Sequence, residues 1–139
     1  MSKDIQQMIQ SQTRMAKSAM RVLSRSSADI RNHALLAMAE SLQDSKDKIQ
    51  AANRIDLENG EKAGLAAPLM QRLRLDDKKI ERMVDNLRQV AALPDPIGAV
   101  ISMGERPNGL KIGTVRVPIG VVAVVYESRP DVTLSLIHI

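Results

Sequence analysis

The stretch that most constrains the fold lies near the end of the chain, in the apolar run Val121-Val122-Ala123-Val124-Val125. Its residues are mostly β-branched and show no polar–apolar alternation, which predicts a strand buried on both faces in a parallel sheet between helices. Pro118 and Gly120 precede the run, and a polar segment begins at Glu127. Because ligands of open α/β sheets bind just past the carboxyl ends of such strands, we expect any site to follow Val125.

Apolar residues before this run recur with the period of an amphipathic helix. Ser, Asp and Pro residues then set the ends of the helices, as N-caps and as helix breakers. The predicted elements are a helix over Ile5–Leu23, a helix from the N-cap Ser27 through Leu42, a helix from Asp44 or Ser45 to near Gly64, a helical turn over Leu69–Leu73, and a helix capped by Asp76 or Asp77 that ends before Pro94. Gly60 falls inside the third helix and weakens its predicted continuity.

After the turn Leu93-Pro94-Asp95-Pro96 the periodicity changes from helical to strand-like. Val100–Met103 is predicted as one strand, and residues 111–117 alternate polar and apolar side chains as a half-exposed strand does. Pro107-Asn108-Gly109 lies between them and is typical of a turn. The sequence therefore predicts a β-hairpin, and its pattern alone fits a simple surface hairpin as well as an arm that contacts another subunit.

Several segments together point to a known family. Residues 118–130 contain Val-Val-Ala-Val-Val-Tyr-Glu-Ser-Arg-Pro and resemble the VPxGVxGVxYESRP signature of the gamma-glutamyl phosphate reductases, which belong to the aldehyde dehydrogenase superfamily. Three further segments are similar to that family in the same order: Ala51–Leu57, Leu93–Gly98 and Arg106–Leu110. The resemblance covers about residues 10–133.

The resemblance implies an incomplete α/β fold. Residues 1–93 would form the helical amino-terminal part of a nucleotide-binding domain, and 94–118 the turn and the hairpin through which subunits of the superfamily associate. Residues 119–133 would hold the first buried strand and the Glu-Ser-Arg-Pro loop, and residues 134–139 a suspected non-native tail. We expect a homo-oligomeric, cytoplasmic enzyme.

The resemblance also implies a reaction in proline biosynthesis. In this family a cysteine thiolate displaces phosphate from gamma-glutamyl phosphate, and NADPH reduces the thioester to glutamate 5-semialdehyde, which suits a nucleophilic thiol. This chain contains no cysteine. We therefore expect no catalytic residue here and an amino-terminal fragment that is inactive alone. The alternative is a helical interaction module that pairs with full-length subunits.

The predicted substrate-binding residues are Ser128 and Arg129. Arg129 precedes a proline, which favours an extended backbone, and its guanidinium suits bidentate binding of a phosphate or carboxylate. The competing interpretation is a weak surface ion pair between Glu127 and Arg129. Asp131 stands where the family pattern has Asn, and an ionised carboxylate cannot donate a hydrogen bond.

Other polar residues have structural interpretations. Asn53 and Asp56 share a helix face and predict a polar anchoring contact, whereas Arg106 and Asn108 belong to the hairpin turn. His33 points away from the apolar stripe of its helix. His33 and His138 are the only histidines and lie far apart, so no metal-ligand spacing exists.

Composition argues against several other classes of function. The net charge is +4, but the cations are spread along the chain and there is one aromatic residue, which disfavours nucleic-acid binding. No apolar stretch approaches membrane-spanning length, and residues 1–20 lack the apolar core of a signal peptide. Leu134–Ile139 departs from the family pattern, so we expect a foreign or out-of-frame segment without a native packing partner.

Overall fold

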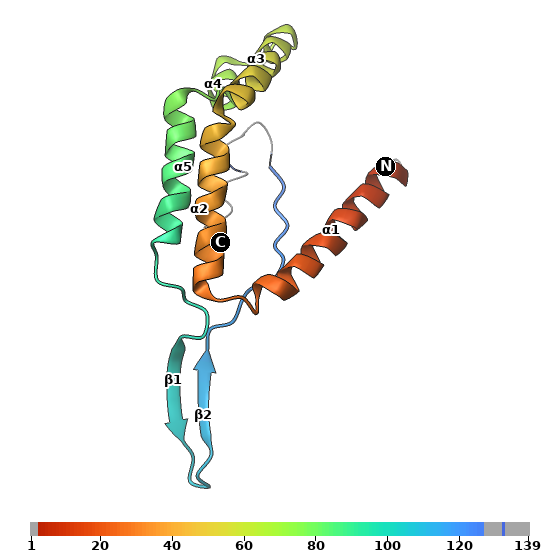
Figure 1. Cartoon of the computed structure of the whole chain (residues 1–139). Helices are drawn as coiled ribbons and strands as arrows, with labels where there is room; N and C mark the ends of the chain where they lie inside the picture. The colour runs from red at the N-terminus through yellow and green to blue at the C-terminus, as the bar shows by residue number, and fades with distance from the viewer. Residues whose placement is uncertain (1–2, 127–131, 133–139) are drawn as a thin grey trace. The chain divides into compact units, whose positions relative to one another are not determined.

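The computed structural model describes residues 3–126 and 132, which form five helices and one β-hairpin within this range (Figure 1). The elements are α1 (Lys3–Leu23), α2 (Ala28–Asp44), α3 (Lys46–Lys62), α4 (Ala67–Leu73), α5 (Asp77–Ala91), β1 (Val100–Glu105) and β2 (Lys111–Val115). The four main helices, the short helical turn and the hairpin predicted from periodicity are therefore confirmed. The chain divides into two compact units, Met1–Ala28 with Pro94–Ala123 and Asp29–Leu93 with Val124–Ile139.

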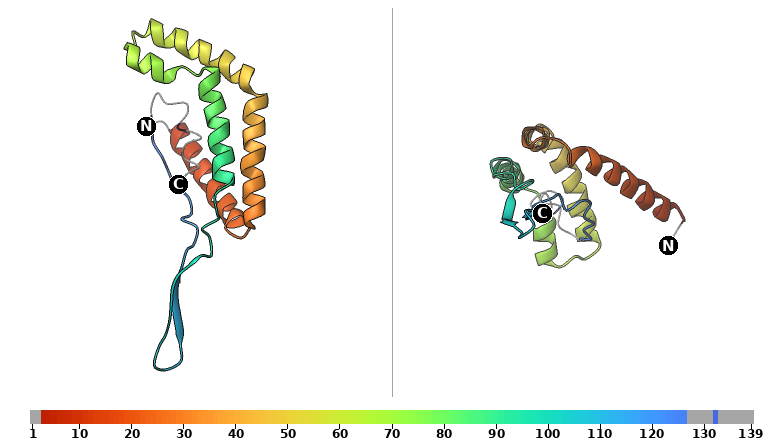
Figure 2. Two further views of the ribbon diagram at one scale, coloured as in Figure 1. Left: turned by 90° about the vertical axis from the view of Figure 1, so that its left-hand side faces the viewer. Right: turned by 90° about the horizontal axis from the view of Figure 1, so that it is seen from below.

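The core of the helical unit lies between α2 and α5, which run side by side (Figure 2). Ala39 from α2 packs with Val84 and Leu87 from α5, and Leu35 and Leu42 cover this cluster from α2. The buried side chains of α5 recur three and four residues apart and so share one face of the helix: Ile80, Met83, Val84 and Leu87. On α2 only Ala39 is fully buried, whereas Ile30 and Met38, which lie on the apolar stripe that the sequence places along this helix, are exposed.

Helix α3 packs closely against α4 at Gly60. A Cβ atom built at this position would lie 2.9 Å from Leu65 Cδ1 and 2.9 Å from Met70 Sδ. The helix continues through Gly60 without interruption, because the absent side chain makes room for Leu65 and Met70. The chain then turns at Gly64, where the positive φ of 70° favours glycine.

The hairpin unit holds one antiparallel pair of strands, with Met103 opposite Gly113 and Glu105 opposite Lys111. A register irregularity between Val100 and Ser102 marks a bulge near the base. At the base, the Arg116 N–H donates to the Ala99 carbonyl at 2.9 Å. Every residue of both strands is exposed.

The run Val121–Val125 does not form the buried strand that its composition predicted. These residues have no regular secondary structure, and all five are exposed. A strand is stable only when a neighbouring backbone satisfies its N–H and C=O groups. No other described strand lies beside this run, so the apolar pattern identified a strand-forming sequence without the sheet that would hold it.

Candidate functional site

The predicted site falls almost wholly outside the described residues. Of the Tyr126–Pro130 segment the structure describes only Tyr126, which is exposed. The predicted substrate ligands Ser128 and Arg129, with Glu127 and Asp131, lie outside the described residues, as does the suspected tail 134–139. The functional assignment of Ser128 and Arg129 therefore stays a prediction.

Asn53 makes the polar anchoring contact that the sequence predicted. Its side chain is 5% exposed, its Nδ2 donates to the Leu73 carbonyl at 2.9 Å, and its Oδ1 accepts from the Leu75 N–H at 2.7 Å. Leu73 is the last residue of α4, and Leu75 lies in the segment that connects α4 to α5, where the backbone has left helical geometry. Asn53 thus satisfies two otherwise buried backbone groups, and its role is structural. Asp56, predicted to share this role, is exposed.

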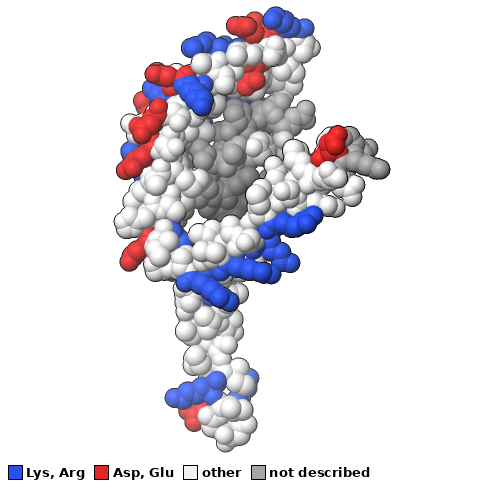
Figure 3. Space-filling view, turned by 45° about the vertical axis from the view of Figure 1, so that its right-hand side comes forward, with Lys and Arg blue, Asp and Glu red and all other residues white. Residues whose placement is uncertain are grey.

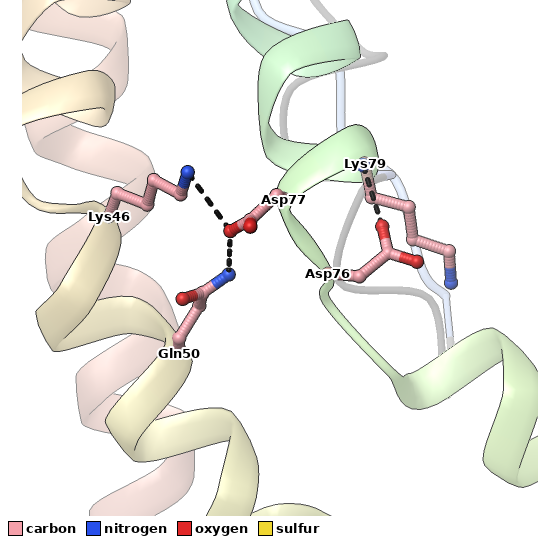
Figure 4. Close-up of polar contacts among 5 residues, drawn as sticks. All are labelled: Lys46, Gln50, Asp76, Asp77 and Lys79. Carbon is pink, nitrogen blue, oxygen red and sulfur yellow. Dashed lines mark hydrogen bonds and ion pairs between the residues drawn. The ribbon is translucent and has the colours of Figure 1, made fainter.

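A polar cluster joins α3 to the first turn of α5 (Figure 4). Asp77 Oδ1 lies 2.9 Å from Lys46 Nζ and accepts a hydrogen bond from Gln50 Nε2 at 2.8 Å. The pKa of Asp77 is lowered first by the hydrogen bond from Lys46, then by the hydrogen bond from Gln50 and by the positive charge of Lys46. The pKa of Lys46 is raised by its hydrogen bond to Asp77. Since Asp77 is 64% exposed, water screens this contact and makes it a weak tether between helices.

Lys79 and Asp76 organise the junction between α4 and α5 (Figure 4). Asp76 is the N-cap of α5, and its Oδ1 accepts from the Lys79 N–H at 2.8 Å. Lys79 Nζ lies within hydrogen-bond distance of three carbonyls at the end of α4, those of Gln71 (2.9 Å), Arg72 (3.2 Å) and Arg74 (2.6 Å). A lysine ammonium there is favoured by the negative end of the helix dipole.

The turn of the hairpin is held by its own backbone, as its Pro-Asn-Gly sequence indicated. The Arg106 N–H donates to Leu110 O at 2.8 Å, the Gly109 N–H donates to Arg106 O at 2.8 Å, and Asn108 Oδ1 accepts from the Leu110 N–H at 3.2 Å. Gly109 has a φ of 81°. A shallow, open depression beside this turn is lined by Ser102, Met103, Gly104, Glu105, Arg106 and Ile112. Because the backbone of Arg106 and the side chain of Asn108 both make hydrogen bonds within the turn, we assign these residues to structure.

The described residues do not assemble a catalytic or metal-binding constellation. Within 3–126 and at 132, no group of His, Asp and Glu side chains is placed to hold a metal ion. His33 is exposed, as predicted, and its Nδ1 lies 2.7 Å from the Asp29 carbonyl. None of the helices in this part of the chain is long and apolar enough to cross a membrane.

Among the described residues, the glycines do not form the kind of cradle in which a dinucleotide phosphate binds. A dinucleotide site needs a backbone cradle that glycines keep open for phosphate. The spaces left by Gly60 and Gly113 are filled by side chains of this chain, Leu65 and Met70 at the first and Met103 at the second. The other described glycines lie at exposed turns or on the exposed hairpin.

The outstanding feature of the described chain is exposed apolar surface in three places. On the hairpin and its base, Val100, Ile101, Met103, Ile112 and Val117 are exposed. The run after it exposes Val121–Val125, and α1 exposes a row of Ile, Met and Leu side chains. Soluble monomers rarely leave contiguous apolar surface uncovered, so these areas are candidate interaction surfaces.

No protein-family model matches the chain. A gamma-glutamyl phosphate reductase from Syntrophomonas wolfei is 47% identical over 133 residues, which are 96% of this chain and 32% of the relative. The crystal structure of the reductase from Thermotoga maritima superposes with a TM-score of 0.84 at 40% identity, over 87% of this chain and 29% of that one. The reductase from Saccharomyces cerevisiae gives a TM-score of 0.82 at 35% identity, over 87% of this chain and 31% of that one.

The chain thus spans about a third of the length of the relatives it matches. The agreement in sequence and in backbone extends over the helices and the hairpin, since both comparisons cover most of the 139 residues. By both measures, the chain is homologous to the amino-terminal region of the gamma-glutamyl phosphate reductases.

Proposed function

We propose that the chain serves as the helical and hairpin portion of a gamma-glutamyl phosphate reductase. The whole enzyme would reduce gamma-glutamyl phosphate to glutamate 5-semialdehyde and phosphate in proline biosynthesis, with NADPH as the reductant, as a cytoplasmic homo-oligomer. The observation that carries this proposal is 47% identity over 96% of the chain to a relative of that name.

The 139-residue chain by itself is proposed to be inactive. Reduction of an acyl phosphate through a covalent intermediate needs a strong nucleophile at neutral pH, and the chain has no cysteine. Its proposed contribution to the substrate site is limited to Ser128 and Arg129, a hydroxyl donor and a planar guanidinium suited to the phosphate or carboxylate of the substrate.

The test compares the chain with a chimera. In the chimera, the chain replaces the matching segment of the Syntrophomonas wolfei reductase and is fused to the remainder of that enzyme. We expect phosphate-dependent reduction of NADP with glutamate 5-semialdehyde from the chimera and none from the chain alone. Turnover by the chain alone would refute the proposed inactivity, and a folded chimera without turnover would refute the proposed contribution.

Substitution within this chimera tests the proposed substrate ligands. Arg129→Lys keeps the charge but loses the bidentate fork, so we expect a rise in KM of about tenfold or more, with Arg106→Lys in the hairpin turn as the matched control. An unchanged KM for Arg129→Lys would favour the surface ion pair with Glu127.

A second candidate function is an interaction module that associates with full-length subunits. The observation that favours it is the hairpin, whose two strands are exposed throughout although two-stranded sheets are marginally stable alone. Sedimentation equilibrium of the chain mixed with the full-length Syntrophomonas wolfei reductase tests it. A stable mixed species would support the module, and independent sedimentation of both proteins would exclude it.

A further inference from the structure

The positive charge of the chain is concentrated in one of its two compact units. Met1–Ala28 and Pro94–Ala123, which form the first unit, contain eight Lys and Arg residues and three Asp and Glu residues, a net charge of +5. Residues 29–93 contain eleven of each kind and are neutral overall. The fold thus gathers cations that the sequence spreads along the chain, and five of the eight lie in α1 or directly after it.

Helix α1 separates these cations from an apolar stripe. Arg14, Lys17 and Arg21 fall within an arc of about 60°, and the space-filling view shows Lys and Arg gathered along one side of α1 (Figure 3). The opposite arc, about 120° wide, carries Ile5, Met8, Ile9, Met15, Ala16, Ala19 and Leu23. The large side chains of this stripe are about half exposed, from 46% at Ile5 to 62% at Met15.

We propose that α1 of the 139-residue chain binds along the surface of an anionic lipid bilayer. Its apolar stripe inserts among the lipid chains, and its cations meet the lipid phosphates. Helices that lie in a bilayer surface combine an apolar face with a polar face rich in Lys and Arg, as α1 does, and they need no membrane-spanning length. This proposal goes beyond the proposed function and does not rest on it.

The dimensions of a helix bring both faces of α1 into contact with lipid. A surface helix inserts its apolar face about 5–10 Å deep, and a helix with its side chains is about 10–12 Å in diameter. The opposite face then lies at the depth of the headgroups, where Arg14, Lys17 and Arg21 meet phosphate groups. Asp4 is the one acidic residue of α1, so little charge opposes this attraction.

The composition of α1 makes the lipid charge decisive. The chain has no Trp or Phe, and its one Tyr lies outside α1, so the helix lacks the aromatic side chains that anchor other segments at a membrane interface. Binding therefore depends on the apolar stripe together with the attraction of each cation to anionic headgroups.

The size of the stripe argues against a second copy of this chain as the occupant. A helix of 21 residues is about 31 Å long, and a stripe about 10 Å wide offers about 300 Å². Two such faces would bury about 600 Å², below the roughly 1,200 Å² of a stable specific dimer. A fluid bilayer needs no matching shape, so it accepts a stripe in which Gln12 and two alanines lie among larger side chains.

Flotation of the 139-residue chain with lipid vesicles tests the proposal. Vesicles rise in a density gradient, whereas assemblies of protein alone stay at the bottom. We expect the affinity for vesicles of phosphatidylcholine and phosphatidylglycerol to be at least about tenfold higher than for phosphatidylcholine alone, and to fall as NaCl is added. Equal affinities, or no flotation with the anionic vesicles, would overturn the proposal.

Two matched charge variants show whether α1 is the part that binds. The double substitution Arg14→Gln with Lys17→Gln removes two cations from α1, and Lys48→Gln with Arg54→Gln removes two exposed cations from α3. We expect the first to weaken binding to the anionic vesicles about tenfold and the second to leave it unchanged, with the same helical circular dichroism in both. An equal loss in both would show that overall charge attracts the chain, against the proposal.

A matched pair of isoleucines tests insertion of the stripe. Ile9 lies in the stripe of α1, whereas Ile55 is an exposed isoleucine of α3. Because a buried apolar side chain contributes to membrane binding, we expect Ile9→Gln to weaken binding several-fold and Ile55→Gln to leave it unchanged. Unchanged binding of Ile9→Gln would refute insertion.

Two glutamines report which side of α1 enters the lipid. Gln12 lies in the middle of the stripe, whereas Gln10 lies about 200° around the helix among the cations, and both are exposed. Because the chain has no native cysteine, Gln12→Cys and Gln10→Cys each accept one environment-sensitive fluorophore. With anionic vesicles we expect a blue shift of the emission from position 12 and little change from position 10. Equal shifts at both positions, or the same shift at position 12 with soluble polyglutamate, would overturn the proposal, the latter in favour of an acidic protein partner.

Discussion

The side chain of Asn53 joins α3 to the end of α4 and to the segment that follows it. Asn53→Leu keeps the size of the side chain but leaves the Leu75 N–H and the Leu73 carbonyl buried without partners. We expect a loss of about 2–4 kcal/mol in the free energy of unfolding, measured by urea denaturation with far-UV circular dichroism. The exposed Asp56→Ala on the same helix should stay within about 0.5 kcal/mol, and an equal effect of both would contradict the role given to Asn53.

The sequence indicated that Asn53 anchors something, but it did not indicate what. Its partners lie 20 and 22 positions further along the chain, beyond the reach of helical periodicity. The contact of Lys46 with Asp77 was missed for the same reason, because single charged residues on two amphipathic helices give no signal of pairing. The N-cap of α5 was narrowed to Asp76 or Asp77, since an N-cap is a local pattern, and the structure assigns it to Asp76.

The pair of Lys46 and Asp77 predicts that stability decreases at both low and high pH. The pKa of Asp77 is lowered from 3.8, so its stabilising contribution is complete above 3.8 and is lost as the pH falls through the lower folded value. The pKa of Lys46 is raised from 10.5, so its contribution is complete below 10.5 and is lost as the pH rises through the higher folded value.

Asp77→Asn removes the charge that causes both shifts. We expect the melting temperature of Asp77→Asn to lie slightly below that of the parent between about pH 5 and 9, and the two to converge at the acid and alkaline ends. The measurement is a series of thermal melts from about pH 2 to about pH 12, which spans both transitions, with the exposed Glu58→Gln as the control. A difference in melting temperature that does not change with pH would contradict this account.

At the scale of elements, α4 depends on a side chain from the next helix. Lys79→Met keeps the apolar stem of the side chain but removes the ammonium from the carbonyls of Gln71, Arg72 and Arg74. We expect faster amide hydrogen exchange throughout Ala67–Leu73 and a loss of about 1–2 kcal/mol in stability. The neighbouring Lys78→Met, on the exposed side of α5, serves as the control; equally fast exchange in both variants would show that the ammonium does not hold α4.

The elements that could be predicted from the sequence are those with local determinants. The main helices have their own apolar periods, α5 has its N-cap Asp76, and the hairpin has its Pro-Asn-Gly turn, so these formed where expected. Ser45, a candidate N-cap of α3, makes no side-chain capping hydrogen bond. The run Val121–Val125 has equally strong local character, yet it lacks strand geometry because its hydrogen-bonding partners are not local. The pattern of this run shows that its residues favour a strand, but a strand also needs neighbouring strands, which the run itself does not contain.

At the scale of the whole molecule, two observations agree: the chain matches only part of its relatives, and it exposes several apolar surfaces. A chain that matches about a third of an enzyme contains a well-formed helical core around Ala39, Val84 and Leu87. It also exposes α1, the hairpin and Val121–Val125, each of which has apolar side chains suited to burial. The sequence could identify the family resemblance from its motifs, but it could not indicate which apolar side chains are exposed in the structure.

The exposed run also determines how the chain behaves in solution by itself. Val121–Val125 is uncharged, strongly β-forming and free of proline, which are the properties of segments that stack into intermolecular sheets. Val125 is 99% exposed, so the segment is accessible to other copies without unfolding of the helical core. We expect the purified chain to form β-rich assemblies that bind thioflavin T, after a lag that shortens with concentration.

Two substitutions at Val124 separate backbone pairing from hydrophobicity. Val124→Pro removes an N–H that an intermolecular sheet needs, whereas Val124→Thr keeps this group and the β-branched shape. We expect Val124→Pro to lengthen the lag several-fold and Val124→Thr to change it much less, while far-UV circular dichroism shows the same helical content in both. Equal lags would mean that another surface nucleates assembly, and then the same pair of substitutions at Ile112 would test the hairpin, whose strands are exposed over their whole length.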